Sequence, residues 1–204
     1  MHAEFELDEV IYAAGETVVA TATHEGARVV LKFHDNPRPA PELLARWRHE
    51  YSTLQSIDSP HVIRALGLRE VERGLVLVLE NFASMNLAQL IERDQLDLAD
   101  RLSLAIRLAR AVGAVHEHRL IHGDIAPKNV LVDPASLDLK LCDFALSSKL
   151  DVQPRRSDGA AMVGTLEYMS PEQTGRTNLD IDYRSDFYSL GATLYELFAG
   201  RPPF

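Results

Sequence analysis

Short runs of β-branched residues dominate the first third of the chain and predict strands. The runs 18–23 (VVATAT) and 28–33 (RVVLKF) are separated by four residues that include a glycine, which is typical of a hairpin. A second hairpin is predicted from 65–71 and 74–82. Within it, the run 75–79 is apolar on both faces, so we expect it to be an interior strand of a sheet.

A helix is predicted after Pro39 and Pro41, because proline is favoured in the first turn of a helix. Its inward positions recur at spacings of four, three and four residues and are occupied by Leu43, Trp47, Glu50 and Leu54. Glu50 thus lies on an apolar helix face and Lys32 in an apolar strand, and because an unpaired buried ion is costly, the two could pair. Taken alone, these two residues favour the simpler alternative, in which both side chains reach solvent.

Two longer helices are predicted in the second part of the chain. One is capped by Asp100 and ends near His118, and its buried stripe is Leu104, Leu108, Ala111 and Val115. The other runs from Asp182 to Ala199 and is ended by Gly200. Its apolar residues occupy both sides, so we expect burial all round: Phe187, Leu190, Leu194 and Phe198 on one side, and Tyr188, Tyr195 and Leu197 on the other.

The shift from strands to helices near residue 82 predicts an α+β protein with two lobes, 1–82 and 83–204. The 204 residues are 46% hydrophobic, which is enough to bury a core. Thirty acidic residues against 21 Lys and Arg give a net charge of −9, which argues against a nucleic-acid partner. The sequence contains neither a membrane-spanning apolar run nor a signal peptide, and its single cysteine forms no internal disulfide. A cytoplasmic protein with no membrane partner is expected.

Hard oxygen ligands gather in the loop 122–129 (HGDIAPKN) and after the small hairpin that follows it. Asp124 and Asn129 stand five residues apart in the loop, and Asp143 follows the second strand of the hairpin. Each alone is more often a turn residue. Together they supply a carboxylate base and ligands for Mg²⁺, which is what phosphoryl transfer from a nucleotide needs.

The set of motifs resembles the protein kinase superfamily, serine/threonine type, from about residue 10 to the end. The matching pieces are VVLKF with Lys32, the helix Glu50, HGDIAPKN, CDFA with Asp143, GTLEYMSPE with Gly164 and Glu172, and DFYSLG with Asp186. The resemblance implies a bilobal fold with a β-rich, nucleotide-binding N-lobe and a mainly helical C-lobe that lacks its last helices. A narrower likeness is to the amino-terminal kinase modules of large bacterial hybrid sensor proteins.

The resemblance also implies a role for each matching residue. Lys32, positioned by Glu50, would hold the α- and β-phosphates of ATP. The nucleotide pocket would further include Val19, Leu79, which resembles the gatekeeper, and the hinge from Glu80 to Phe82.

In the second lobe, Asp124 would orient the substrate hydroxyl and accept its proton, and Asn129 and Asp143 would bind Mg²⁺. Thr165 is typical of kinases that act on serine or threonine. Asp186 would accept backbone N–H groups of the loop 122–124, although a helix N-terminus also favours aspartate on its own account.

The glycine-rich loop departs from the family pattern. Tyr12, Ala14 and Thr17 stand where its three glycines normally lie, which leaves only Gly15. Glycine allows the backbone to approach phosphate closely, so weak ATP affinity is expected. Ala145 likewise replaces the glycine that usually follows Asp-Phe.

The catalytic loop departs from the pattern as well. Gly123 replaces the arginine that reads a phosphorylated activation loop, so activation by such phosphorylation is not expected, although Ser147, Ser148 and Ser157 are available. Ala126 replaces a lysine near the transferred phosphoryl group. Lys128 can supply the missing cation, its alternative being a solvated loop lysine.

Protein kinases continue past the equivalent of Pro203 with helices that cover the last predicted helix and supply an arginine for Glu172. We therefore expect an exposed apolar patch, a Glu172 that lacks this arginine, and either a longer polypeptide or a truncated reading frame, with further domains or a partner over that helix. The leading function is an ATP- and Mg²⁺-dependent kinase of protein substrates. A pseudokinase or nucleotide-binding scaffold is the alternative, and a small-molecule kinase of the aminoglycoside phosphotransferase type ranks third.

Overall fold

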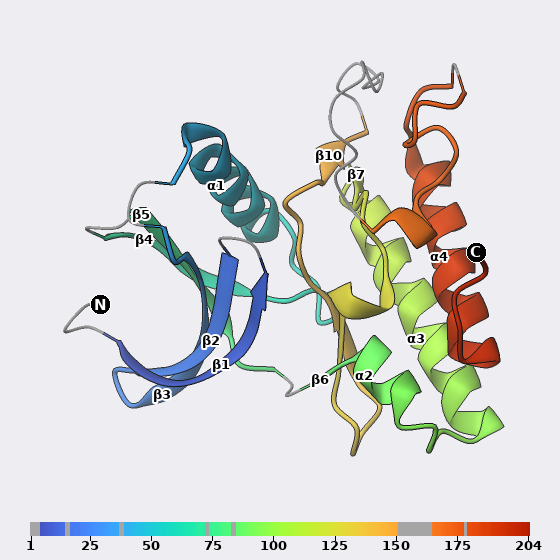
Figure 1. Cartoon of the computed structure of the whole chain (residues 1–204), viewed down its shortest axis with the longest axis horizontal. Helices are drawn as coiled ribbons and strands as arrows, with labels where there is room; N and C mark the ends of the chain where they lie inside the picture. The colour runs from blue at the N-terminus through green and yellow to red at the C-terminus, as the bar shows by residue number, and fades with distance from the viewer. Residues whose placement is uncertain are drawn as a thin grey trace. The chain divides into compact units, whose positions relative to one another are not determined.

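The computed structural model describes residues 5–14, 17–36, 39–71, 74–82, 85–150, 165–177 and 179–204. The chain divides into two compact units, a strand-rich one and a mainly helical one (Figure 1). Unit 1 comprises the residues up to Ser56 together with Ile63–Phe82, and unit 2 comprises Ile57–Val62 together with Ala83–Phe204. The segment 57–62, expected in the first lobe, therefore packs with the second unit.

Unit 1 is a five-stranded antiparallel sheet with one helix. The strands follow the order β1-β2-β3-β5-β4 and are β1 (Glu6–Ala14), β2 (Thr17–His24), β3 (Ala27–His34), β4 (Ala65–Val71) and β5 (Gly74–Glu80). Helix α1 (Pro41–Gln55) packs against β4 and β5. Both predicted hairpins are confirmed, and β5 is the interior strand that its apolar run predicted.

The core of unit 1 is formed by side chains that alternate along the strands. It includes Ala20, Ala22, Val29, Leu31, Phe33, Val76 and Val78. Since Lys32 stands between Leu31 and Phe33 in β3, its side chain leaves the opposite face of the sheet. Strand periodicity thereby separates the packing face from the face that carries the lysine.

In its described residues, unit 2 contains the helices α2 (Leu87–Glu92), α3 (Leu98–Glu117) and α4 (Tyr183–Ala199). Helices α3 and α4 lie side by side (Figure 1). Strands β6 (Met85–Asn86), β8 (Val130–Val132) and β9 (Leu139–Leu141) form a small sheet, and β7 (Leu120–Ile121) pairs with β10 (Ser148–Lys149). The described part of the unit also contains the 3₁₀ turns η1 (Pro127–Asn129) and η2 (Leu166–Tyr168).

Helix α3 begins before the predicted cap. Its N-cap is Asp97, whose Oδ1 accepts a hydrogen bond from the backbone N–H of Asp100 at 2.8 Å. The side chain of Asp100 in turn accepts from the backbone N–H of Asp97 at 3.3 Å. The prediction mistook the third helical residue of a capping box for the cap, because both positions carry aspartate. The predicted buried stripe of α3 is confirmed.

Helix α4 is capped by Asp182 and ends at Gly200, which has a left-handed φ of 71°. Burial all round was wrong, because Phe187 and Phe198 are 52% and 43% exposed. The buried positions are instead mostly small or polar, namely Ser185, Asp186, Ser189, Ala192, Thr193 and Leu197. Small side chains let the neighbouring loops approach this helix closely, and the aromatic residues are left on the described surface, as the expected apolar patch.

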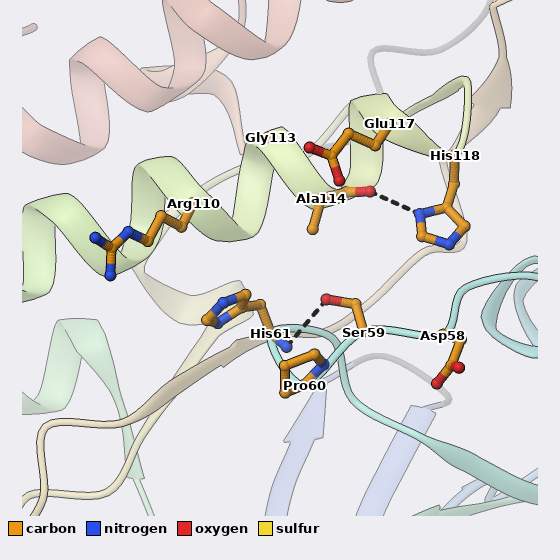
Figure 2. Close-up of a pocket in the computed structure, with 9 residues that line it drawn as sticks. All are labelled: Asp58, Ser59, Pro60, His61, Arg110, Gly113, Ala114, Glu117 and His118. Carbon is orange, nitrogen blue, oxygen red and sulfur yellow. Dashed lines mark hydrogen bonds between the residues drawn. The ribbon is translucent and has the colours of Figure 1, made fainter.

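Unit 2 also holds a cavity of about 440 Å³ between the segment 58–61 and the C-terminal half of α3 (Figure 2). Its lining includes Arg110, Glu117 and His118. The described residues of unit 2 that are predicted to act in catalysis or to bind metal are not among the residues that line this cavity. None of the helices in the described ranges combines the length and the apolar character that a bilayer crossing requires.

Candidate active site

Lys32 and Glu50 form a buried ion pair in unit 1. The Nζ of Lys32 lies 2.9 Å from Oε2 and 3.1 Å from Oε1 of Glu50. Lys32 is 8% exposed and Glu50 only 1%. The solvent-exposed alternative was therefore wrong, and the pairing implied by the family resemblance is present. Two short charge-assisted contacts offset the desolvation of both groups.

Two of the other residues predicted to bind nucleotide share the Lys32 face of the sheet. Val19 is paired with Lys32 across β2 and β3, and Leu77 is paired with Lys32 across β3 and β5. Leu79, two residues beyond Leu77, faces the same way because side chains alternate along a strand. Around Lys32, this face therefore carries the apolar side chains of Val19, Leu77 and Leu79.

The predicted hinge residues lie at the end of β5. Glu80 exchanges backbone contacts with Arg64, since its N–H donates to the Arg64 carbonyl at 3.0 Å. Its carboxylate accepts from the backbone N–H of Arg64 at 2.8 Å. The side chain of Glu80 thus anchors the strand end within unit 1, and Phe82, half-buried, follows it.

Asp124 is held by contacts on both carboxylate oxygens. Its Oδ2 accepts from Asn129 Nδ2 at 2.8 Å. Its Oδ1 accepts from the backbone N–H and the hydroxyl of Thr165, at 2.9 and 3.1 Å. The structure thereby brings Thr165, 41 residues away in the sequence, to the loop that holds Asp124 and Asn129, and it fixes the carboxylate plane.

The oxygen atoms near Asn129 fit a magnesium ion. Both hydrogens of the Asn129 amide are used, because Nδ2 also donates to the carbonyl of Asp124 at 2.8 Å, so its Oδ1 is left as the acceptor. The backbone N–H of Cys142 donates to the Asn129 carbonyl at 3.0 Å, which places Asp143 beside this residue. An amide oxygen and a carboxylate are hard ligands that suit Mg²⁺ shared with phosphates.

A site of purely protein ligands is not present in the described ranges, since they contain no group of three His, Cys, Asp or Glu residues that could hold a metal. Mg²⁺ is usually bound by one or two carboxylates and completed by phosphate oxygens and water. Asp143 adopts a left-handed φ of 65°, a conformation that aspartate tolerates better than most residues. Asn129 and Asp143 together supply two hard oxygen donors, and Mg²⁺ bound with a nucleotide usually takes no more than this from the protein.

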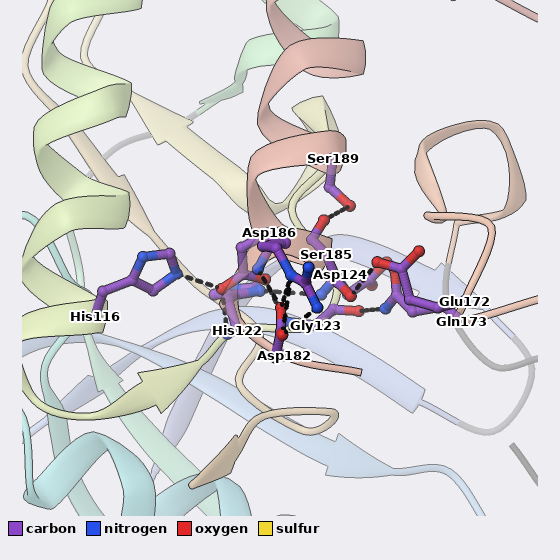
Figure 3. Close-up of polar contacts among 11 residues, drawn as sticks. His116, His122, Gly123, Asp124, Glu172, Gln173, Asp182, Ser185, Asp186 and Ser189 are labelled. Atoms are coloured by element: carbon purple, nitrogen blue, oxygen red, sulfur yellow. Dashed lines mark hydrogen bonds and ion pairs between the residues drawn. The ribbon is translucent and has the colours of Figure 1, made fainter. Parts of the chain in front are cut away.

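Asp186, fully buried in the first turn of α4, holds the catalytic loop (Figure 3). Its oxygens accept from the backbone N–H groups of His122 and Gly123, at 2.8 and 2.9 Å. Nε2 of His116 in α3 lies 2.8 Å from Oδ2. The backbone contacts that the family resemblance implied are thus present. The helix N-terminus also favours this charge, so the two interpretations act together.

The segment that follows Thr165 is fastened to α4. Glu172 accepts a hydrogen bond from the hydroxyl of Ser185 at 2.6 Å. The hydroxyl of Ser189 donates to the carbonyl of Tyr168 at 2.7 Å, and the phenol of Tyr168 donates to Glu196. Burial, together with the contact with Glu196, raises the pKa of Tyr168. A serine hydroxyl of the neighbouring helix thus binds the carboxylate that pairs with an arginine in the protein kinase family.

The sequence patterns did not predict several contacts between α4 and the segments that pack against it. Ser185 and Ser189 stand four residues apart on α4, a spacing that places both on one helix face. The large apolar residues of α4 concealed this signal. His116 and Gln173 carried no local signal, because each acts on a distant segment.

Lys128 is exposed in η1 and has no polar partner among the described residues, whereas Ala126 is fully buried. The proposed cation is therefore available at the surface of the catalytic loop. The sequence expectations for Gly15, Ser157 and Gly164 lie outside the described residues. The approach of Lys32 to the residues of unit 2 stays a prediction.

Comparisons with known proteins agree with the motif set. The protein kinase domain matches residues 13–204. The chain is 32% identical to the serine/threonine-protein kinase PknA of Corynebacterium glutamicum, over 99% of this chain and 44% of the relative. It is 30% identical to PknB of Mycolicibacterium smegmatis, over 98% of this chain and 33% of the relative. With PrkC of Bacillus subtilis it shares 30% identity over 95% of this chain and 29% of the relative.

The chain spans less than half the length of these curated relatives. The family match nevertheless extends over both units, from the end of β1 through α4. The ion pair of unit 1 and the held carboxylates of unit 2 lie at the motif residues that carried the resemblance. This chain belongs to the protein kinase family.

Proposed function

We propose that this chain is a bacterial serine/threonine protein kinase, which transfers the γ-phosphate of ATP to hydroxyl groups of protein substrates. The observation that carries the proposal is the Asp124 carboxylate, held by Asn129 on one oxygen and by Thr165 on the other. A fixed carboxylate next to hard oxygen ligands is the arrangement that phosphoryl transfer requires. The curated relatives named above are all serine/threonine-protein kinases.

In the proposed reaction, the substrate hydroxyl oxygen forms a bond to the γ-phosphorus while the bond to the β–γ bridging oxygen breaks, which releases ADP. Asp124 orients the hydroxyl and accepts its proton. Lys32, held by Glu50, binds the α- and β-phosphates, and Lys128 balances negative charge that develops on the transferred group. Mg²⁺, when bound by Asn129 and Asp143, neutralises phosphate charge.

Val19, Leu79 and the segment from Glu80 to Phe82 are proposed to bind the adenosine part of ATP. The apolar sheet face around Lys32 supports this assignment, because adenine packs against apolar side chains. The replaced glycines at Tyr12, Ala14 and Thr17 predict weak affinity for ATP.

The protein substrate is proposed to meet the chain in the cytoplasm, and the exposed aromatic side of α4 is proposed to be covered by a further part of the polypeptide or by a partner. Support for the covered face comes from Phe187, Tyr195 and Phe198, which are 52%, 44% and 43% exposed. Exposed apolar patches of this kind mark interaction surfaces.

The test is phosphate transfer from labelled ATP to casein and to histone, with and without Mg²⁺. We expect Asp124→Asn to lower the transfer rate by about 100-fold or more, since it removes the proton acceptor. Asp133→Asn is the matched control, because this partly exposed turn carboxylate of the β8–β9 hairpin carries no proposed role. Equal signal from wild type and Asp124→Asn would contradict the kinase proposal.

Two alternatives give distinct outcomes in the same experiment. A pseudokinase would show a thermal shift with Mg-ATP but no transfer that depends on Asp124. A small-molecule kinase would phosphorylate an aminoglycoside rather than the proteins. The family match and the relatives favour neither alternative.

A further inference from the structure

The side chain of Gln173 joins two backbone segments of unit 2 (Figure 3). Its Nε2 donates to the carbonyl oxygen of Gly123 at 2.7 Å. Its Oε1 accepts from the backbone N–H of Ser170 at 3.0 Å and from the hydroxyl of Ser170 at 3.1 Å. Because Gly123 directly precedes Asp124, this amide bridge from Ser170 through Gln173 to Gly123 ends one residue from the proposed base.

The backbone at Gly123 is held from both sides. Its N–H donates to Asp186 at 2.9 Å, and its carbonyl accepts from Gln173. Its φ of +79° is in the left-handed region, and a Cβ atom there would lie 3.0 Å from the carbonyl oxygen of Leu146. A side chain such as arginine therefore does not fit position 123 in this arrangement.

Position 123 thus has no arginine, the residue with which many kinases bind a phosphorylated activation loop. Instead, the neutral amide of Gln173 contacts the Gly123 carbonyl. An amide can bridge two backbone segments because it carries a donor and an acceptor on one planar group. Ser170 is fully buried, so its N–H and hydroxyl depend on this acceptor for their hydrogen bonds.

We propose that Gln173 is a positioning residue for the protein-kinase reaction: its amide holds the segment 165–173 against the catalytic loop, so that activity does not require phosphorylation of this chain. This inference rests on the proposed function. Gln173 acts through the placement of Asp124 and of the segment beside it, and it does not touch the reacting atoms. A displacement of about 1 Å at such a site lowers rates by about 100-fold.

The sharpest variant is Gln173→Glu, which keeps the acceptor for Ser170 but, when ionised, sets a carboxylate against the Gly123 carbonyl. We expect kcat/KM for the protein substrate to fall by about 10- to 100-fold, with the KM for ATP unchanged. Gln89→Glu is the matched control, because the exposed Gln89 uses only its amide oxygen, which accepts from Asn86. Its kcat/KM should equal that of wild type.

The pH profile separates positioning from a general loss of structure. In the Gln173→Glu variant, the introduced carboxyl group can donate to the Gly123 carbonyl when it is protonated, and desolvation and the facing carbonyl raise the pKa of this carboxyl. The ratio of variant to wild-type kcat/KM should therefore rise as the pH falls. A ratio that does not change with pH, or wild-type activity in the variant, would overturn the proposal.

Phosphorylation is tested on the wild-type chain treated with phosphatase and checked by mass spectrometry. The unphosphorylated protein should keep its full rate from the first turnover, and a lag that ends with autophosphorylation would contradict the inference. Hydrogen exchange at Ser170 gives a readout independent of ATP. Exchange should be faster in Gln173→Met, which lacks both halves of the bridge. Unchanged exchange overturns the inference, whereas absent transfer in wild type overturns only the proposed function.

Discussion

Two buried helical carboxylates, Glu50 in α1 and Asp186 in α4, are stabilised in different ways. Glu50 meets one side-chain cation, Lys32. Asp186 accepts two backbone N–H groups, from His122 and Gly123, and contacts the ring of His116. An ion pair between side chains can be replaced by an apolar pair. The backbone N–H groups that Asp186 accepts from cannot be removed by substitution, so they need an acceptor whichever residue stands at position 186. The comparison predicts that the two sites respond differently to mutation.

The largest effect is expected for Asp186→Ala. It leaves the N–H groups of buried His122 and half-buried Gly123 without acceptors, and each costs about 1–3 kcal/mol, so the free energy of unfolding should fall by about 4 kcal/mol. Urea unfolding followed by circular dichroism measures this loss. Asp180→Ala, an exposed residue two positions before the α4 cap, is the control and should change stability by less than about 0.5 kcal/mol. A loss for Asp186→Ala as small as for the control would show that the loop is held by other contacts.

Next comes Lys32→Met, expected to cost about 3 kcal/mol of unfolding free energy because it leaves Glu50 buried without its cation. The loss of stability is smaller than for Asp186→Ala, because the buried Glu50 carboxylate can become neutral by taking up a proton. A backbone N–H group that lacks an acceptor cannot be neutralised in this way. The double variant Lys32→Met with Glu50→Leu should regain most of the stability but no phosphate transfer. A double variant that is no more stable than Lys32→Met would contradict the claim that the stability loss comes from the uncompensated charge of Glu50.

A Gly123→Ala variant tests how tightly Asp186 and Gln173 hold the loop. We expect a loss of about 2 kcal/mol, because alanine is strained at φ +79° and its Cβ meets the Leu146 carbonyl. Gly113→Ala in the middle of α3 is the matched control, since nothing lies within 4 Å of the added Cβ, and it should gain about 0.5–1 kcal/mol. Thermal unfolding of the two variants should therefore shift in opposite directions.

The smallest change in stability is expected for Asp182→Ala. Asp182 is a partly exposed helical cap, and it can be compared with the two buried carboxylates. The hydrogen bond from the Arg184 side chain lowers the pKa of Asp182. A lowered folded-state pKa means that the stabilisation is present above the ordinary carboxyl pKa and is lost as the pH falls through the folded value. Asp182→Ala should cost about 1 kcal/mol at pH 7, as a lost helix cap, and progressively less below about pH 4. A difference that stays constant with pH would contradict this.

Local patterns predicted much of the fold. Both hairpins of unit 1, helix α1 and the buried stripe of α3 follow from periods of two or about 3.6 residues, which depend on neighbours along the chain. The predictions were wrong where one element packs against several others that are distant in the sequence. In α4, large aromatic residues suggested the buried side, whereas Ser185 and Ser189 are buried because Glu172 and Tyr168 reach them.

The sequence by itself determined the set of residues that carry the family resemblance, because their types and order suit phosphoryl transfer: Lys32, Asp124, Asn129, Asp143 and Asp186. Tertiary structure alone decided their partners. Whether Lys32 meets Glu50 or water depends on how α1 packs against the sheet, and no local pattern encodes that distance. The contact of Gln173 with Gly123 spans 50 residues, so only the folded chain brings this donor and this acceptor together.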